Sequence, residues 1–306
     1  MTSADTLPGL PGADDDPGQG AASLVLFERL LADAPELDGS AGTLLERHRA
    51  HRAGPHAELL GPLVLPAGAL AAVAPELATA DHGLPVVLTA WGPGALDALR
   101  IGRDLLLADD HAELVGVRIA LGQEYEPAAA VDDLLDRLDF SVPAWIGLDP
   151  GEGWEAALDL IADDGAENVL LIPGAAGDRT RSQDGSEDGS GQESWPPDVE
   201  GTAGLLRRAV DRDVTLALGR GLWPAVTEGE NLGLLNMLCA VRAALNGALV
   251  AELATILASR VEAPLLAATR RMSDADAAVV RSFLATADVR DLAGTVDRLQ
   301  ALGLLG

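Results

Sequence analysis

The chain has 306 residues, with 21 basic residues against 48 acidic ones, a formal net charge of −27 and an isoelectric point near 4.3. Every basic residue is an arginine, which excludes a Schiff-base lysine, a lysine general base and the phosphate-binding lysine of P-loop proteins and kinases. So acidic a chain argues against nucleic acid and anionic membranes as partners, because both bind basic surfaces.

Two segments are predicted to be disordered. Residues 1–20 form an acidic leader rich in proline and glycine, without the apolar stretch of a signal peptide. Residues 177–194 lack apolar side chains and cannot contribute to a core. The single cysteine, Cys239, excludes an intramolecular disulfide and lies in an apolar run, as a buried thiol would. We therefore expect a cytoplasmic protein with one folded domain over residues 21–306.

Short apolar runs alternate with helical patterns along this domain. The expected strands are Leu63–Pro66, Pro85–Ala90, Val115–Leu121, Ala144–Leu148, Asn168–Pro173, Val214–Leu218, Pro264–Ala268 and Ser282–Ala287. Continuous apolar runs of this kind are typical of parallel strands that are buried on both faces. The pattern predicts an α/β fold of the TIM type, a (β/α)8 barrel. An open doubly wound sheet is the alternative.

The last repeats are expected to be irregular, because residues 231–259 read as two consecutive helices. Their apolar run is interrupted by polar residues, which argues against a membrane-spanning segment.

Several segments in the same order resemble a family of uncharacterised barrel-like proteins common in actinobacteria. They are residues 45–60 with the following LVLPAG, then WPPDVEGTAGLLRRAV, GLWPAV, LGLLNMLCA and the terminal VDRLQALGLL. The resemblance implies a barrel with polar groups at its strand ends. It also implies a ligand-binding role for Asn236, which keeps the asparagine of a family His-Gly-Phe-Leu-Asn motif.

The chain departs from this family where the family places lysine and histidine. A Lys-x-Arg motif at one strand end falls on the apolar residues Val169–Ile172, and a second lysine falls on Leu216 or Ala217. Paired histidines fall near Leu222 and Trp223. The probable site of the family has therefore either been lost or been rebuilt for a less polar ligand.

Aromatic residues follow several predicted strands. Trp91, Trp154, Trp195 and Trp223 are all expected at the carboxyl face of the barrel, where (β/α)8 proteins carry their sites. Trp91, Trp154 and Trp223 are candidate ligand-binding residues for an apolar, cyclic or cationic ligand. The alternative is that these rings only anchor loops and close the barrel.

Two carboxylates and one arginine complete the candidate site. Asp149 and Glu124 follow neighbouring strands and are the candidate catalytic residues, as acid–base groups or as ligands of a hard cation. Asp149 also fits ordinary turn chemistry before Pro150. Arg220, between two glycines, is a candidate anion-binding residue or a plain turn.

These features favour a non-catalytic or catalytically altered barrel that binds a small molecule or a partner at its carboxyl face. The alternative is a lyase- or isomerase-like enzyme that acts on a small anionic metabolite through Asp149 and Glu124, with or without a divalent cation. A third reading is a structural subunit whose apolar C-terminal helices form a homo-oligomer. The sequence names no cofactor and assigns no set of metal ligands, and it leaves open whether the chain is an enzyme.

Overall fold

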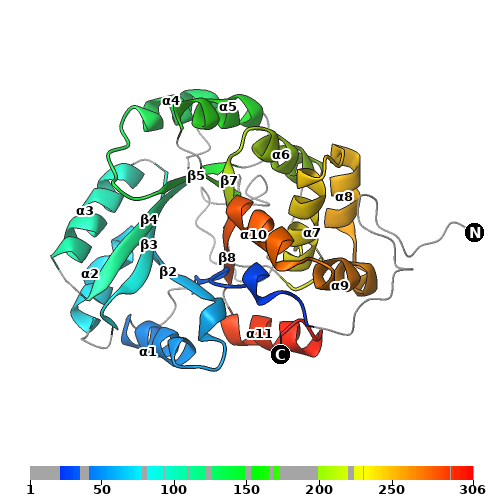
Figure 1. The fold of residues 1–306 in the computed structure, drawn as a ribbon. Helices are drawn as coiled ribbons and strands as arrows, with labels where there is room; N and C mark the ends of the chain where they lie inside the picture. Colours follow the sequence, from blue (N-terminus) through cyan, green and yellow to red (C-terminus); the bar gives the residue numbers. More distant parts are fainter. Residues whose placement is uncertain are drawn as a thin grey trace, which may run out of the picture.

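The apolar runs of the sequence form eight parallel strands that close into a barrel, as the computed structural model shows (Figure 1). The structure describes residues 21–34, 41–77, 81–92, 94–108, 111–120, 126–148, 153–165, 168–171, 199–219, 224–229, 231–289 and 291–305. The predicted TIM-type α/β fold is thereby confirmed, and the open doubly wound sheet is excluded by the closure.

The strands follow one another around the barrel in chain order. They are β1 (Leu31–Asp33), β2 (Leu60–Pro66), β3 (Leu84–Trp91), β4 (Ala112–Ala120), β5 (Ala144–Leu148), β6 (Asn168–Leu171), β7 (Thr215–Leu218) and β8 (Leu284–Val289). The barrel closes where β8 pairs with β1, with Leu31 beside Ala287 and Asp33 beside Val289.

Helices surround the strands (Figure 1). They are α1 (Ala41–Arg52), α2 (Leu70–Val73), α3 (Ala95–Leu107), α4 (Pro127–Leu135), α5 (Trp154–Asp164), α6 (Val199–Asp211), α7 (Leu234–Leu245), α8 (Val250–Ala258), α9 (Glu262–Arg270), α10 (Asp274–Phe283) and α11 (Leu292–Ala301). The two consecutive helices expected within residues 231–259 are α7 and α8. Together with α9 and α10 they make the connection between β7 and β8 longer than any other.

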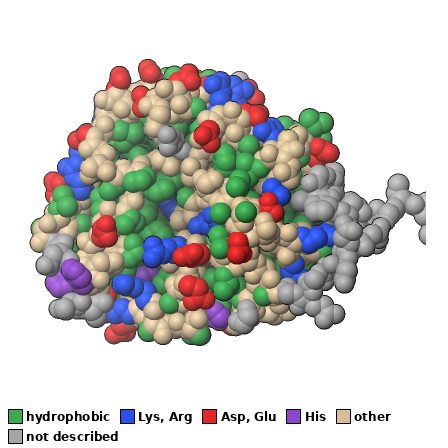
Figure 2. All heavy atoms as spheres, viewed as in Figure 1, with side chains coloured by type: hydrophobic (Ala, Val, Ile, Leu, Met, Phe, Trp, Pro, Cys, Tyr) green, Lys and Arg blue, Asp and Glu red, His purple; other side chains and the backbone are tan. Residues whose placement is uncertain are grey.

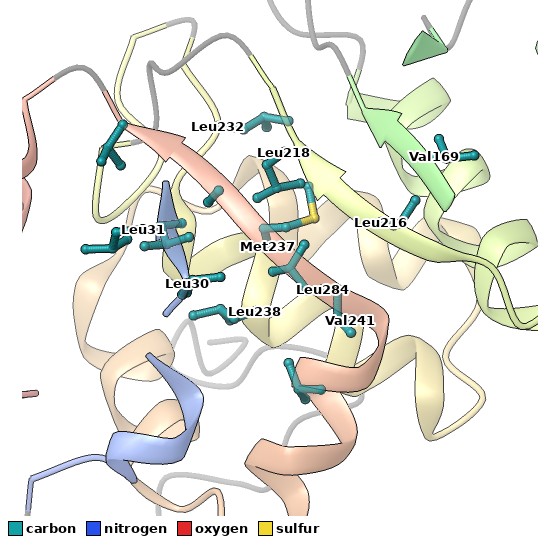
Figure 3. Close-up of a cluster of buried hydrophobic side chains, with 14 of the residues drawn as sticks. Leu30, Leu31, Val169, Leu216, Leu218, Leu232, Met237, Leu238, Val241 and Leu284 are labelled. Carbon is teal, nitrogen blue, oxygen red and sulfur yellow. The ribbon is translucent and has the colours of Figure 1, made fainter. Parts of the chain in front are cut away.

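The main hydrophobic core lies between the strands and the helices. Side chains alternate between the two faces of a strand, so every second residue of each strand points outward to this core. Figure 3 shows Leu216 and Leu218 of β7 and Leu284 of β8 gathered with Met237 and Val241 of α7. Burying such side chains is worth about 1.5–3 kcal/mol each, so this layer carries much of the stability of the fold.

One predicted strand is wrong and one strand was missed. Pro264–Ala268 lies inside α9, where Leu265 and Ala268 face the core. A short apolar run reads equally well as a strand or as the buried side of a helix, and a proline in the first helical turn needs no hydrogen-bond donor. The missed strand is β1, which has only three residues and ends in a charged one.

The charge that hid β1 is paired in the structure. The carboxylate of Asp33 is buried and faces α1, where His48 Nδ1 lies 3.0 Å from Asp33 Oδ2 and Arg47 Nη2 lies 3.4 Å from Oδ1. Buried charges persist in folded proteins when they are paired and hydrogen-bonded. Asp33 thus joins β1 to the basic segment of α1.

At the amino ends of the strands, α10 meets the first described segment. Arg281 of α10 donates hydrogen bonds to the backbone oxygens of Leu284, Ala285 and Glu28. Burial lowers the pKa of this guanidinium to about 10, although Glu28 opposes the shift.

On the face that Figure 2 shows, acidic and basic side chains are interspersed with apolar ones, so the net negative charge does not gather there into a patch of one sign.

The predicted disordered segments and the expected lack of a membrane span are the remaining predictions about the fold. The predicted disordered leader, residues 1–20, and the predicted insert, residues 177–194, lie outside the described residues. Among the helices within the described ranges, none is both long enough and apolar enough to cross a membrane.

The thiol of Cys239 is predicted to be unreactive in the native protein. It is fully buried in α7, and burial raises its pKa from an ordinary 9.0 to about 12. The thiolate fraction at mildly alkaline pH therefore falls by about a thousandfold. Ellman's reagent should label the native protein only at the rate of unfolding, and label it at once in guanidinium chloride. Rapid stoichiometric labelling of the folded protein would contradict this placement.

Candidate functional site

The inner faces of the strands differ in character from the outer faces. The outward residues join the main core, whereas the inward ones form two small separate clusters. One cluster contains Ala32, Val64 and Val87, and the other contains Ala120, Leu170 and Ala217 with Trp145 packed against them. The inward side chains are therefore mostly smaller than the outward leucines, isoleucines and valines.

A charged pair lies in the middle of this interior. Arg118 on β4 donates to Asp288 on β8, and Arg118 Nη2 also donates to the hydroxyl of Thr286 over 2.8 Å. Arg118 is 1% exposed and Asp288 is 5% exposed. Because β4 and β8 are four strands apart in a closed barrel of eight, the ion pair bridges opposite walls.

A bulge on β4 turns Arg118 inward. The register between β3 and β4 shifts after Val86, so that Val86 pairs with Leu114 but Val87 pairs with Gly116. Val115 is the extra residue, and beyond it the alternation of faces is reversed. Gly116, Arg118 and Ala120 consequently point into the barrel, while Val117 and Ile119 join the outer core.

Inward side chains of a (β/α)8 barrel form layers of four, contributed by alternate strands. The strand registers group Val64, Arg118, Leu170 and Asp288 into one layer, called here the charged layer. The layer toward the amino ends, the lower layer, consists of Ala32, Val87, Trp145 and Ala217. The layer toward the carboxyl ends, the small layer, consists of Ala34, Thr89, Gly147 and Gly219.

The lower layer is filled mainly by one ring. Trp145 lies over Gly116, where an added β-carbon would come within 2.3 Å of Trp145 Cζ3. The small layer has the opposite character, because two of its four positions are glycines and one is an alanine. An added β-carbon at Gly219 would lie 3.0 Å from Leu170 Cδ1, so it points toward the charged layer. Barrel interiors are ordinarily packed with bulky branched residues, so the small layer departs from the usual composition.

Four of the predicted site residues lie outside the described residues: Glu124, Asp149, Arg220 and Trp223. Their convergence on one centre, and with it the acid–base pair of Asp149 and Glu124, stays a prediction. The described residues contain no group of three or more His, Cys, Asp and Glu side chains arranged to hold a metal ion.

Trp91 lies at the carboxyl end of β3. Its register partner is the inward Ala120, so its position belongs to the inner face. The side chain is 48% exposed, which places it at the rim of the barrel mouth. Of the two candidate tryptophans that the structure describes, Trp91 and Trp154, only Trp91 occupies an inward position.

Trp154 lies elsewhere. It is the first residue of α5 and packs against the outer core, and an added β-carbon at Gly204 of α6 would be 3.4 Å from its Cζ2 atom. The ring therefore fills the space between α5 and α6 on the outer side of the strands. Trp154 therefore packs between helices and not on the inner face of the barrel.

Asn236 holds three chain segments together. Its Oδ1 accepts from the backbone nitrogen of Thr227 over 2.9 Å, and its Nδ2 donates to the backbone oxygens of Ile256 and Ser259, each over 2.7 Å. The residue is fully buried at the start of α7. These bonds fix the end of α8 against α7. The side-chain amide of Asn236 thus bonds to the backbone of the protein, and its predicted ligand-binding role stays a prediction.

Three residues of the barrel interior were not predicted from the sequence: Arg118, Trp145 and Asp288. A signal for Arg118 was present, because a single arginine interrupts an otherwise apolar strand that should be buried on both faces. Trp145 stands within the predicted strand Ala144–Leu148, whereas the candidate tryptophans follow strand ends. Asp288 lies in β8 just beyond the predicted strand Ser282–Ala287, which begins and ends two residues too early.

Removing one partner of the ion pair is predicted to cost far more than removing both. Arg118→Met leaves the charge of Asp288 inside the barrel without its arginine, which should lower the free energy of unfolding by about 3–5 kcal/mol. Adding Asp288→Leu should restore most of that loss. Urea unfolding followed by circular dichroism measures both. As a control, Arg137→Met breaks a pair whose side chains are 52% and 70% exposed and should cost less than about 1 kcal/mol. Equal losses in the single and double variants would contradict the pairing.

Comparison with known proteins gives no match to a family model and none to a curated protein. The barrel itself agrees with the fold that the resemblance to actinobacterial proteins implied, and the family assignment stays an expectation.

Proposed function

We propose that the chain binds a small molecule at the carboxyl mouth of the barrel, above the charged layer. The observation that carries the proposal is the buried Arg118–Asp288 pair beneath the small layer. Small-molecule sites carry a few polar groups that orient a ligand inside an apolar surround, and barrel proteins carry such sites at the carboxyl face.

The energetics of the ion pair support a binding role. Desolvating two charges is expensive, and replacing a buried pair with packed apolar residues is often neutral or stabilising, by about 1–4 kcal/mol. Packing alone therefore does not account for Arg118 in the middle of β4.

The inward residues of β6 and β7 favour binding over turnover. The resemblance places family lysines on these strands, and the interior positions here are Leu170 and Ala217, both buried and apolar. No lysine is present in the chain to replace them. A non-catalytic or catalytically altered barrel is therefore the function that we propose.

Four further proposals rest on the sequence alone. They are the cytoplasmic location, the absence of nucleic-acid partners, a homo-oligomer and membership of the actinobacterial family. The enzyme alternative rests on Asp149 and Glu124, and detection of multiple-turnover conversion of a metabolite that Asp149→Ala or Arg220→Ala abolishes would refute the non-catalytic reading.

A thermal-shift screen of the full chain against small metabolites tests the binding site. A ligand at a hundred times its Kd adds about 2.7 kcal/mol to stability, which corresponds to a rise in Tm of about 5 °C for a domain of this size. Ala120→Leu places a larger inward side chain at the carboxyl end of β4 and should remove the response.

The matched control is Leu107→Ala, at a position 74% exposed on α3, which should keep the response. A ligand that stabilises the wild type and Ala120→Leu equally binds elsewhere, and that result would count against the proposed site. A screen without any stabilising compound would count against binding altogether.

A further inference from the structure

Three inward residues stand side by side across neighbouring strands. Thr89 on β3 pairs in register with Arg118 on β4, and Arg118 pairs with Trp145 on β5. Each step along this row also descends one layer, from the small layer through the charged layer to the lower layer. Thr89, Arg118 and Trp145 are called here the donor row, because each carries an N–H or O–H group.

Two nitrogen atoms of this row lack hydrogen-bond partners within the described part of the chain. Arg118 Nε and Trp145 Nε1 are buried atoms without a hydrogen-bond partner among the described residues. The hydroxyl of Thr89, a residue only 6% exposed, stands in the neighbouring register position and adds a further donor group. Nearly all buried polar groups in proteins are hydrogen-bonded, and an unsatisfied one is costly. Two such groups on adjacent strands favour an acceptor from outside the chain.

The charge balance decides the kind of acceptor. The positive charge of Arg118 is already neutralised by Asp288, which lies in the same layer. A further anion beside that pair would leave one uncompensated negative charge inside the barrel, where desolvation disfavours it. An uncharged oxygen avoids this cost and still accepts from N–H and O–H groups.

We propose that the donor row binds the carbonyl oxygen of an uncharged small molecule, such as a ketone or an amide. This inference rests on the proposed binding function and specifies its ligand class. The carbonyl end enters through the small layer, past Thr89, and is held by Arg118 Nε–H and Trp145 Nε1–H. The indole ring offers the ligand an apolar face, which suits a cyclic or planar body.

The test is nuclear magnetic resonance of the full-length, ¹⁵N-labelled protein with two ring-matched probes. Cyclopentanone supplies a neutral carbonyl, and cyclopentanecarboxylate supplies an anion on the same ring. Trp145→Phe identifies the Trp145 indole N–H signal by its loss. If that variant does not fold, Phe variants of the other four tryptophans identify the signal by elimination. We expect cyclopentanone to shift this signal saturably and cyclopentanecarboxylate to bind at least tenfold more weakly.

Thr89→Val removes one donor with little change of shape, and should weaken cyclopentanone binding by about three- to tenfold, as one hydrogen bond does. Thr215→Val is the matched control, because this β7 hydroxyl donates to the backbone oxygen of Ser282 and lies outside the donor row. It should leave the affinity unchanged.

The other outcomes overturn the inference in distinguishable ways. Tighter binding of the carboxylate would replace the neutral carbonyl by an anion and leave the binding function standing. No shift by either probe would mean that a water molecule satisfies the row. An unchanged affinity in Thr89→Val would exclude the row as the contact. None of these results decides the metabolite screen, which depends on Ala120→Leu and not on these probes.

Discussion

The closure of the barrel through β8 and β1 is the constraint on which the interior depends. Arg118 and Asp288 are separated by 170 positions in the chain, and they meet because closure puts β4 and β8 on opposite walls of one narrow space. In an open sheet the same two strands would lie at a distance, and each charge would face the helix layer alone. The polar floor of the proposed site is therefore a consequence of topology and not of local sequence.

Each strand serves two environments at once. The outward residues of β7 and β8, such as Leu216, Leu218 and Leu284, fill the space against α7 (Figure 3). The inward residues Ala217 and Gly219 pack beside Leu170. Burial of large side chains outside stabilises the barrel, which allows the inner face to carry small residues and a charged pair without loss of the fold.

The sequence predicts the fold well because buried parallel strands are apolar on both faces and end at glycine, proline or aspartate. Runs such as Ala144–Leu148 coincide with their strands. Strand prediction fails where the composition of a segment does not match its environment in the fold. Pro264–Ala268 is an apolar run that packs as a helix. β1 is a short strand whose Asp33 pairs with Arg47 and contacts the ring of His48, residues that a local pattern cannot bring together.

The site is harder to predict, because the direction of a side chain depends on register. Strand-end reasoning places Trp91 at the mouth, but it gives no face for Arg118. Counted regularly from the amino end of β4, position 118 would point outward, and the single extra residue at Val115 reverses this. The charge itself supplies the missing information. Outward, the guanidinium would lie unpaired among the leucines and valines of the main core, at a large desolvation cost. Only the inward face offers Asp288, so the arginine within an apolar strand indicates both the bulge and the polar interior.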